Sequence, residues 1–157
     1  MAERLSTGFA DAVNAVGSVK TVMANSVIHI YSGSQPATAD ASETGTLLMI
    51  LTVGSGAFVP GVSTNGLNMD VSTAGVLAKT AAETWSGIGL AAASTGTAAG
   101  WFRWYDNAVV TGASTTAVRL DGAIGTSTAY EMNWSNTTIV EGVTATVNNH
   151  NYTTTKA

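Results

Sequence analysis

The histidines are the first residues to consider for chemistry, because imidazole is a common metal ligand and proton carrier. His29 stands between Ile28 and Ile30 in a run typical of a β-strand, and His150 lies in a polar stretch rich in asparagine. Neither has a second imidazole or a carboxylate at the short spacing of a metal site, and the chain has no cysteine. We therefore predict a structural role for His29, a loop or exposed strand end for His150, and no metal.

Serine and carboxylate catalysis find little support in the sequence. Residues 54–56 (GSG) lack the spacing of a nucleophile elbow and are typical of a turn. Asp106 and Asp121 could form a glycosidase pair if they faced one cleft, but both precede turn-forming residues. Residues 87–92 match G-x-G-x-x-A without the strand and helix context of a dinucleotide site. We expect a protein that is not an enzyme and needs no cofactor.

The aromatic residues are the set that could bind a ligand. Trp85, Trp101 and Trp104 could form a stacking platform for sugar rings, because indole offers a large flat face. Adjacent residues on a strand point to opposite faces, however, so Trp101-Phe102 and Trp104-Tyr105 must place some of these rings in a core. We favour core positions with subunit contacts, and we keep the three tryptophans as a candidate aromatic contact surface.

Charge is scarce in this chain. Only 10% of the 157 residues are charged, against about a quarter in an ordinary soluble domain. Soluble monomers usually carry many mixed charges on their surface, so this composition favours an assembly component. The net charge is −4 and the six basic residues are scattered, which argues against nucleic acid as a partner. No apolar run approaches the roughly 20 residues of a membrane span, and we expect no secretory signal and synthesis in a cytoplasm.

The first 25 residues differ from the rest and form a predicted helical arm (1–25). From residue 6 to residue 25 the apolar positions Phe9, Val13, Val16 and Met23 recur at helical spacing. Ser6 or Thr7 can cap the first turn, and residues 17–18 (GS) divide the segment into two short helices. Helices this short need a surface to pack on, and that surface could belong to their own domain or to a neighbouring subunit.

Everything after residue 25 is typical of β-structure. Short runs rich in β-branched and aromatic residues cover 27–31, 46–53, 67–71, 76–78, 84–90, 100–106, 117–124, 130–134 and 143–148. Turn-forming residues separate these runs, and residues 65–66 (NG) are a hairpin signal. We predict a mainly β fold, an antiparallel, jelly-roll-like β-sandwich over 26–157. Residues 47–53 and 101–105 are apolar on both faces, so we expect them to be covered on both sides.

Several segments carry a resemblance to a known family. They are residues 30–36 (IYSGSQP), 39–41 (ADA), 44–48 (TGTLL), 96–103 (GTAAGWFR), 121–127 (DGAIGTS) and 139–142 (IVEG). Across nearly its whole length the chain resembles small structural proteins of the virions of tailed bacteriophages. The resemblance implies a location in the virion after synthesis in the host cytoplasm, and it brings no functional residues with it.

Within tailed phages, a β-rich protein of this size is similar to capsid decoration, or cement, proteins. The resemblance then implies a non-enzymatic protein that binds the major capsid protein or another virion protein, as a homo-oligomer with a trimer favoured. We expect the helical arm to make that contact through Phe9, Val13, Val16 and Met23. The alternative is a neck, tail or fibre-associated protein, including a receptor or glycan-binding module that uses the tryptophans.

Overall fold

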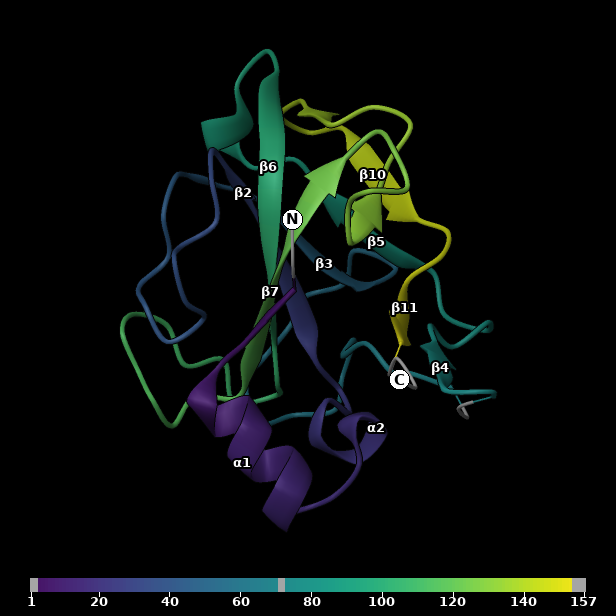
Figure 1. Cartoon of the computed structure of the whole chain (residues 1–157). Helices are drawn as coiled ribbons and strands as arrows, with labels where there is room; N and C mark the ends of the chain where they lie inside the picture. The colour runs from purple at the N-terminus through teal and green to yellow at the C-terminus, as the bar shows by residue number, and fades with distance from the viewer. Residues whose placement is uncertain (1–2, 71–72, 154–157) are drawn as a thin grey trace.

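The computed structural model describes residues 3–70 and 73–153, and this part of the chain is mainly antiparallel β-structure with two short α-helices (Figure 1). In chain order the elements are β1 (Arg4–Leu5), α1 (Thr7–Ala15), α2 (Val19–Val22), β2 (Val27–Ser32), β3 (Leu47–Val53), β4 (Val76–Ala78), β5 (Trp85–Ile88), a 3₁₀ turn (Ala91–Ala93), β6 (Thr97–Tyr105), β7 (Arg119–Gly125), β8 (Met132–Asn133), β9 (Thr138–Ile139), β10 (Thr144–Val147) and β11 (Asn151–Thr153). The predicted β class is thereby confirmed.

One large sheet organises the molecule. Its hydrogen-bonded order is β1-β7-β6-β2-β3-β5-β10, while β8 pairs with β7 and β9 pairs with β6. The neighbours along the main path are antiparallel, and β8 is parallel to β7. A separate ribbon joins β11 to β4, so the end of the chain lies beside its middle (Figure 1). Consecutive strands pair at β2–β3 and β6–β7, whereas β1–β7, β6–β2 and β5–β10 join strands that are distant in sequence.

The two helices lie at one end of the sheet and begin where the sequence predicts (Figure 1). The Ser6 hydroxyl accepts a hydrogen bond from the amide of Phe9, and Ser18 accepts one from the amide of Thr21, so both serines are N-caps. Asn25 then takes a positive φ of 55°, which turns the chain into β2.

The helical segment is packed tightly against the β-structure. A Cβ on Gly8 would come within 2.3 Å of the Thr116 carbonyl oxygen, so α1 approaches the chain before β7 more closely than a larger residue would allow. Phe9 and Met23 belong to the same buried apolar cluster as the strands. Just before α1, β1 pairs with β7, and Leu5 lies opposite Leu120.

Some predicted strands have different limits or are missing. Residues 67–70 make only isolated bridges, at Leu67 and Met69, and Val71 lies outside the described residues. Asn65 has a positive φ of 59°, but Leu67 pairs with Ser26 rather than across a hairpin, because the long-range contact with the start of β2 prevails. The short strands β1, β9 and β11 were not predicted, since two or three residues carry no readable periodicity.

The central strand β6 is buried on both faces, as the sequence predicts for residues 101–105. Phe102 and Trp104 belong to the main apolar core. Trp101, Arg103 and Tyr105 point to the other face, where they hydrogen-bond to residues of the loop between β2 and β3. This second face is therefore covered by loops of the same chain.

Candidate interaction surface

The three tryptophans proposed as an aromatic contact surface are all core residues. Trp85, Trp101 and Trp104 are each 0% exposed. Their indole N–H groups donate, respectively, to the Glu83 carboxylate at 2.8 Å, to the Thr44 carbonyl at 3.2 Å and to the Ser26 hydroxyl at 2.7 Å. The prediction of an aromatic surface is wrong, because burial with a polar partner for each N–H satisfies these rings within the fold.

The four apolar residues of the helical segment do not form one surface. Phe9 and Met23 are 1% and 0% exposed and lie in the core, and Val13 is half-buried against it. Only Val16 faces outward, with 75% of its surface exposed. The expected partner contact through all four side chains is therefore incompatible with this structure, in which the helical stripe packs on its own sheet.

The histidines are both buried. His29 packs edge-on against Tyr105, with ring centroids 4.9 Å apart. His150, expected in a loop or exposed strand end, is instead 6% exposed and lies 5.4 to 5.7 Å from the rings of Trp85, Phe102 and Trp104. Burial lowers the pKa of each imidazole to about 4, so both are neutral at pH 7.

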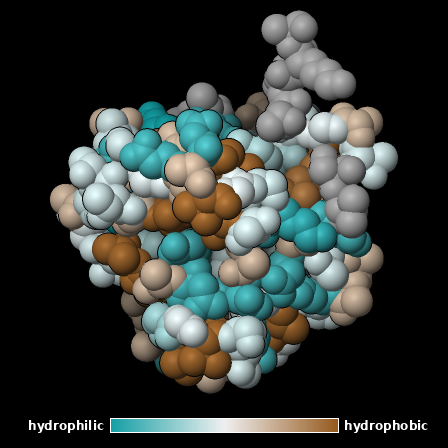
Figure 2. All heavy atoms as spheres, turned by 90° about the horizontal axis from the view of Figure 1, so that it is seen from below, coloured by the Kyte–Doolittle hydropathy of each residue, from teal (hydrophilic) through white to brown (hydrophobic). Residues whose placement is uncertain are grey.

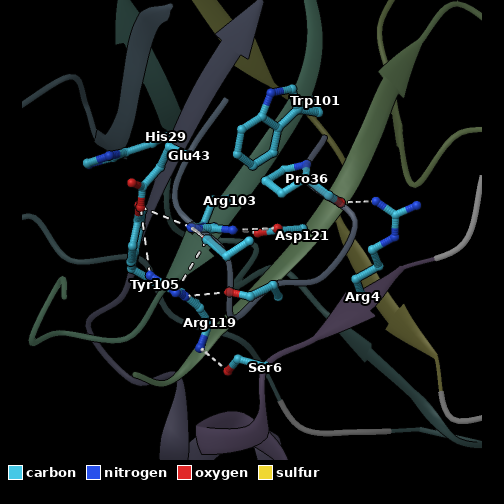
Figure 3. Close-up of polar contacts among 12 residues, drawn as sticks. Arg4, Ser6, His29, Pro36, Glu43, Trp101, Arg103, Tyr105, Arg119 and Asp121 are labelled. Atoms are coloured by element: carbon cyan, nitrogen blue, oxygen red, sulfur yellow. Dashed lines mark hydrogen bonds and ion pairs between the residues drawn. The ribbon is translucent and has the colours of Figure 1, made fainter. Parts of the chain in front are cut away.

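A network of charged side chains fills the face of the sheet under the loops (Figure 3). Arg103 binds Asp121 through two parallel hydrogen bonds of 2.6 and 2.7 Å, and its third nitrogen donates to Glu43 at 3.0 Å. Arg103 and Asp121 are 0% exposed. Burial opposes the charge of Arg103, but the bond to Asp121 outweighs it and raises the pKa of the guanidinium.

Glu43 joins this network to the loop between β6 and β7. It accepts hydrogen bonds from the Tyr105 hydroxyl at 2.5 Å and from the Gly112 amide at 3.0 Å. Burial alone would raise the pKa of Glu43, but these bonds and the Arg103 charge lower it to about 2. Arg119 donates to the carbonyls of Ala39 and Gly112 at 2.6 and 2.7 Å. The network fastens two loops to the sheet and leaves its charges paired inside the fold.

Asp106 and Asp121, the two carboxylates considered as a glycosidase pair, have different hydrogen-bond partners. Asp121 is held by Arg103 beneath the loops. Asp106 instead accepts a hydrogen bond from the Ala108 amide at 3.1 Å, which is a turn contact. The two carboxylates therefore serve separate structural roles.

An apolar hollow of about 420 Å³ lies on the outer face of β3 and β5. Its walls come from these strands and from loops, and consist of His29, Ile50, Thr52, Ser55, Gly56, Ala57, Phe58, Pro60, Ile88, Leu90 and Val109. Ile88 and Leu90 are 47% and 36% exposed although they are large and apolar. None of these residues is charged at pH 7, because His29 is neutral. The apolar hollow is thus an uncharged surface that another protein could cover.

Among the described residues, the end of the molecule that carries the helices has no apolar surface comparable to the hollow on β3 and β5. Figure 2 shows that end, where apolar side chains form small separate patches among polar ones. Val16, the C-cap residue of α1, is the most exposed large apolar residue of the described chain. Scattered single apolar residues are normal on protein surfaces, so the hollow is the better candidate for an interface.

The G-x-G-x-x-A match lies beside this hollow and has a packing role. In the G-x-G-x-x-A match, a Cβ on Gly87 would lie 2.4 Å from the Ile50 carbonyl oxygen, and one on Gly89 would lie 2.0 Å from that of Val140. The glycines therefore permit close packing of backbones. Ile88 lies between these glycines and Leu90 follows them, and both side chains line the hollow and are exposed.

Comparison with protein families, with characterised proteins and with solved structures gave no match. Within residues 3–70 and 73–153, no helix has both the length and the apolar character needed to span a membrane. The same part of the chain holds no cluster of three or more histidine or carboxylate side chains suited to a metal ion.

Proposed function

We propose that this chain is a non-enzymatic structural protein of a tailed-phage virion, and specifically a capsid decoration protein that binds the assembled head. The observation that carries the proposal is the apolar hollow on β3 and β5, which leaves Ile88 and Leu90 exposed in a chain with 10% charged residues. Each Å² of apolar surface that a partner covers contributes about 25 cal/mol of favourable free energy. Covering the hollow would therefore stabilise the contact. The major capsid protein is the proposed partner.

The physics of decoration fits this surface. A decoration protein binds only the assembled shell, and binding to one state stabilises that state by mass action. No catalytic group is needed for that role. The buried network of Arg103, Asp121 and Glu43 supports it by holding two loops firmly on the sheet. Low surface charge reduces the cost of removing water from the contact.

We also infer that the large sheet curls into a jelly-roll-like sandwich. Supporting this, Phe102 of β6 belongs to the same buried apolar cluster as Trp85 of β5 and Val147 of β10, although β6 is separated from the adjacent pair β5 and β10 by β2 and β3 in the sheet order. A sheet whose two halves face the same core must bend around it. A trimer in solution or on the particle is part of the same proposal.

Paired variants test the surface. Ile88→Asp places a charge in the hollow, whereas Val16→Asp places one at the C-cap of α1, and the two side chains are 47% and 75% exposed. We expect Ile88→Asp to abolish incorporation into particles and Val16→Asp to leave it intact, measured by mass spectrometry of purified particles. Equal incorporation of the two variants would show that the hollow is not the surface that binds the particle.

Counting copies of the unmodified chain per particle tests the location. On the order of hundreds of copies supports the shell or the tail tube, because symmetric assemblies of both kinds repeat their subunits many times. About a dozen copies or fewer would support the alternative, a neck, tail or fibre-associated protein. Absence from purified particles would overturn both.

A further inference from the structure

A second hollow, of about 420 Å³, lies between the chain that follows β8 and the chain around β10. We call it the asparagine pocket, and its walls are Asn133, Trp134, Ser135, Asn136, Ala145, Thr146, Val147, Asn148 and Asn149. No charged residue lines it. Its volume falls toward the lower end of the range of about 300–1,000 Å³ for small-molecule sites. The pocket therefore has the size for a small neutral ligand.

The polar groups of the asparagine pocket are largely unused by the protein. Within the described part of the chain, Asn136 accepts a hydrogen bond from the Thr138 amide at 2.9 Å, while the side-chain amides of Asn133, Asn148 and Asn149 make none. All three are exposed. Each amide presents two donors and an acceptor, so the pocket offers groups of both kinds on neighbouring walls.

Trp134 supplies a second and independent observation. This wall residue is only 8% exposed, and its indole N–H is buried without an acceptor among the described residues. An unpaired buried donor costs about 1–3 kcal/mol, so native structures usually pair it. The other tryptophans all pair theirs. The wall of the asparagine pocket therefore includes a tryptophan whose donor the fold leaves unpaired.

We propose that the asparagine pocket binds a neutral saccharide. Hydroxyl groups both donate and accept, as amides do, so a sugar can satisfy several asparagines at once. An anion such as phosphate would find no cation among the walls, and a cation would find no carboxylate. This site is separate from the buried set of Trp85, Trp101 and Trp104, and it does not depend on the proposed role in the capsid.

The test is a titration of the full chain followed by ¹H–¹⁵N NMR. The probes are three neutral disaccharides, maltose, lactose and N,N′-diacetylchitobiose, with inorganic phosphate as the charged probe. We expect at least one disaccharide to shift the Trp134 indole signal and the Asn148 and Asn149 side-chain signals saturably. A Trp134→Phe variant identifies the indole signal. The indole signals of Trp85, Trp101 and Trp104 should not shift.

A double variant supplies the matched comparison. Asn148→Ala with Asn149→Ala should weaken disaccharide affinity about fivefold or more, since the double variant removes two hydrogen bonds to the sugar. Asn14→Ala, at an exposed asparagine of α1, should bind like the unmodified chain. The proposal would be overturned by no saturable shift with any disaccharide, by unchanged affinity in the double variant, or by phosphate shifting these signals when the sugars do not.

Discussion

At the scale of single residues, the unusual feature is that two of the six basic residues are fully buried. Arg103 and Arg119 are 0% exposed, and both bind groups of the loops that cover the sheet. A buried ion pair contributes little net stability against an apolar pair of similar volume, but removing one partner leaves a charge uncompensated. The scarce charges of this chain are thus used partly for internal structure.

Removing Asp121 from the buried Arg103–Asp121 ion pair tests whether an uncompensated charge destabilises the fold. We expect Asp121→Leu to lower the free energy of unfolding by about 3–5 kcal/mol, because Arg103 loses its bidentate carboxylate in a site that excludes water. Urea unfolding at neutral pH measures the change. The double variant Arg103→Met with Asp121→Leu should recover most of the loss. Asp11→Ala, on the exposed face of α1, should stay within about 0.5 kcal/mol. If the single and double variants lose equal stability, the uncompensated charge is not the cause.

At the scale of elements, the helical segment shows how one stripe of residues divides between core and solvent. Phe9 lies in the core while Val16 is 75% exposed. The spacing predicts a helix over this segment, but it does not say which protein covers the stripe. Here β1 pairs with β7 just before α1, and this pairing directs the helix onto its own sheet.

Two truncations on the same helix test this packing. Phe9→Ala should lower the free energy of unfolding by about 3–5 kcal/mol, because it leaves a cavity in the core. Val16→Ala should change it by no more than about 0.5 kcal/mol, since that side chain is already exposed. Chemical denaturation of both variants measures the difference. Equal and small effects would show that residues 1–25 act as a separate arm.

At the scale of the whole molecule, buried titratable groups couple stability to pH. His29 and His150 have a pKa of about 4 in the fold against an ordinary value of 6.5. Below pH 6.5 the unfolded chain binds protons that the folded chain does not, so stability is complete above pH 6.5 and falls toward pH 4. Glu43, with a pKa of about 2 against 4.5, extends the loss below pH 4.5. The pKa of Glu3 is raised to about 7 by desolvation and by the Glu131 carboxylate, so Glu3 opposes part of this loss between pH 7 and 4.5, and the histidines and Glu43 should still weaken the fold in acid.

The expected size of this effect follows from the two histidines. A shift of about 2.5 pKa units corresponds to about 3 kcal/mol for each imidazole. We expect the free energy of unfolding to fall between pH 6.5 and 4, and His150→Phe, which keeps an aromatic ring among Trp85, Phe102 and Trp104, to remove about half of the contribution that the two histidines make to that fall. Urea titrations at several pH values measure it. A pH-independent stability in the unmodified chain would contradict the burial of these groups.

Much of the local structure could be predicted from the sequence, whereas the candidate sites could not. Ser6 and Ser18 mark the starts of the two helices, because caps depend on residues a few positions away, and Asn25 marks the turn into β2. Strands β2, β3 and β6 follow from runs of β-branched and aromatic residues. The apolar hollow and the asparagine pocket each combine segments from separate parts of the chain, so no single run of residues revealed them.

By itself, the sequence determined the β class, the two capped helices and the scarcity of charge, because each depends on composition or on near neighbours. Only the tertiary structure decided that the tryptophans and Phe9 are core, that Arg103 pairs with Asp121, and that Ile88 stays exposed. The physical reason is distance along the chain. Ser6 bonds to Ala117, 111 residues away, and such long-range contacts decide which side of each element is buried.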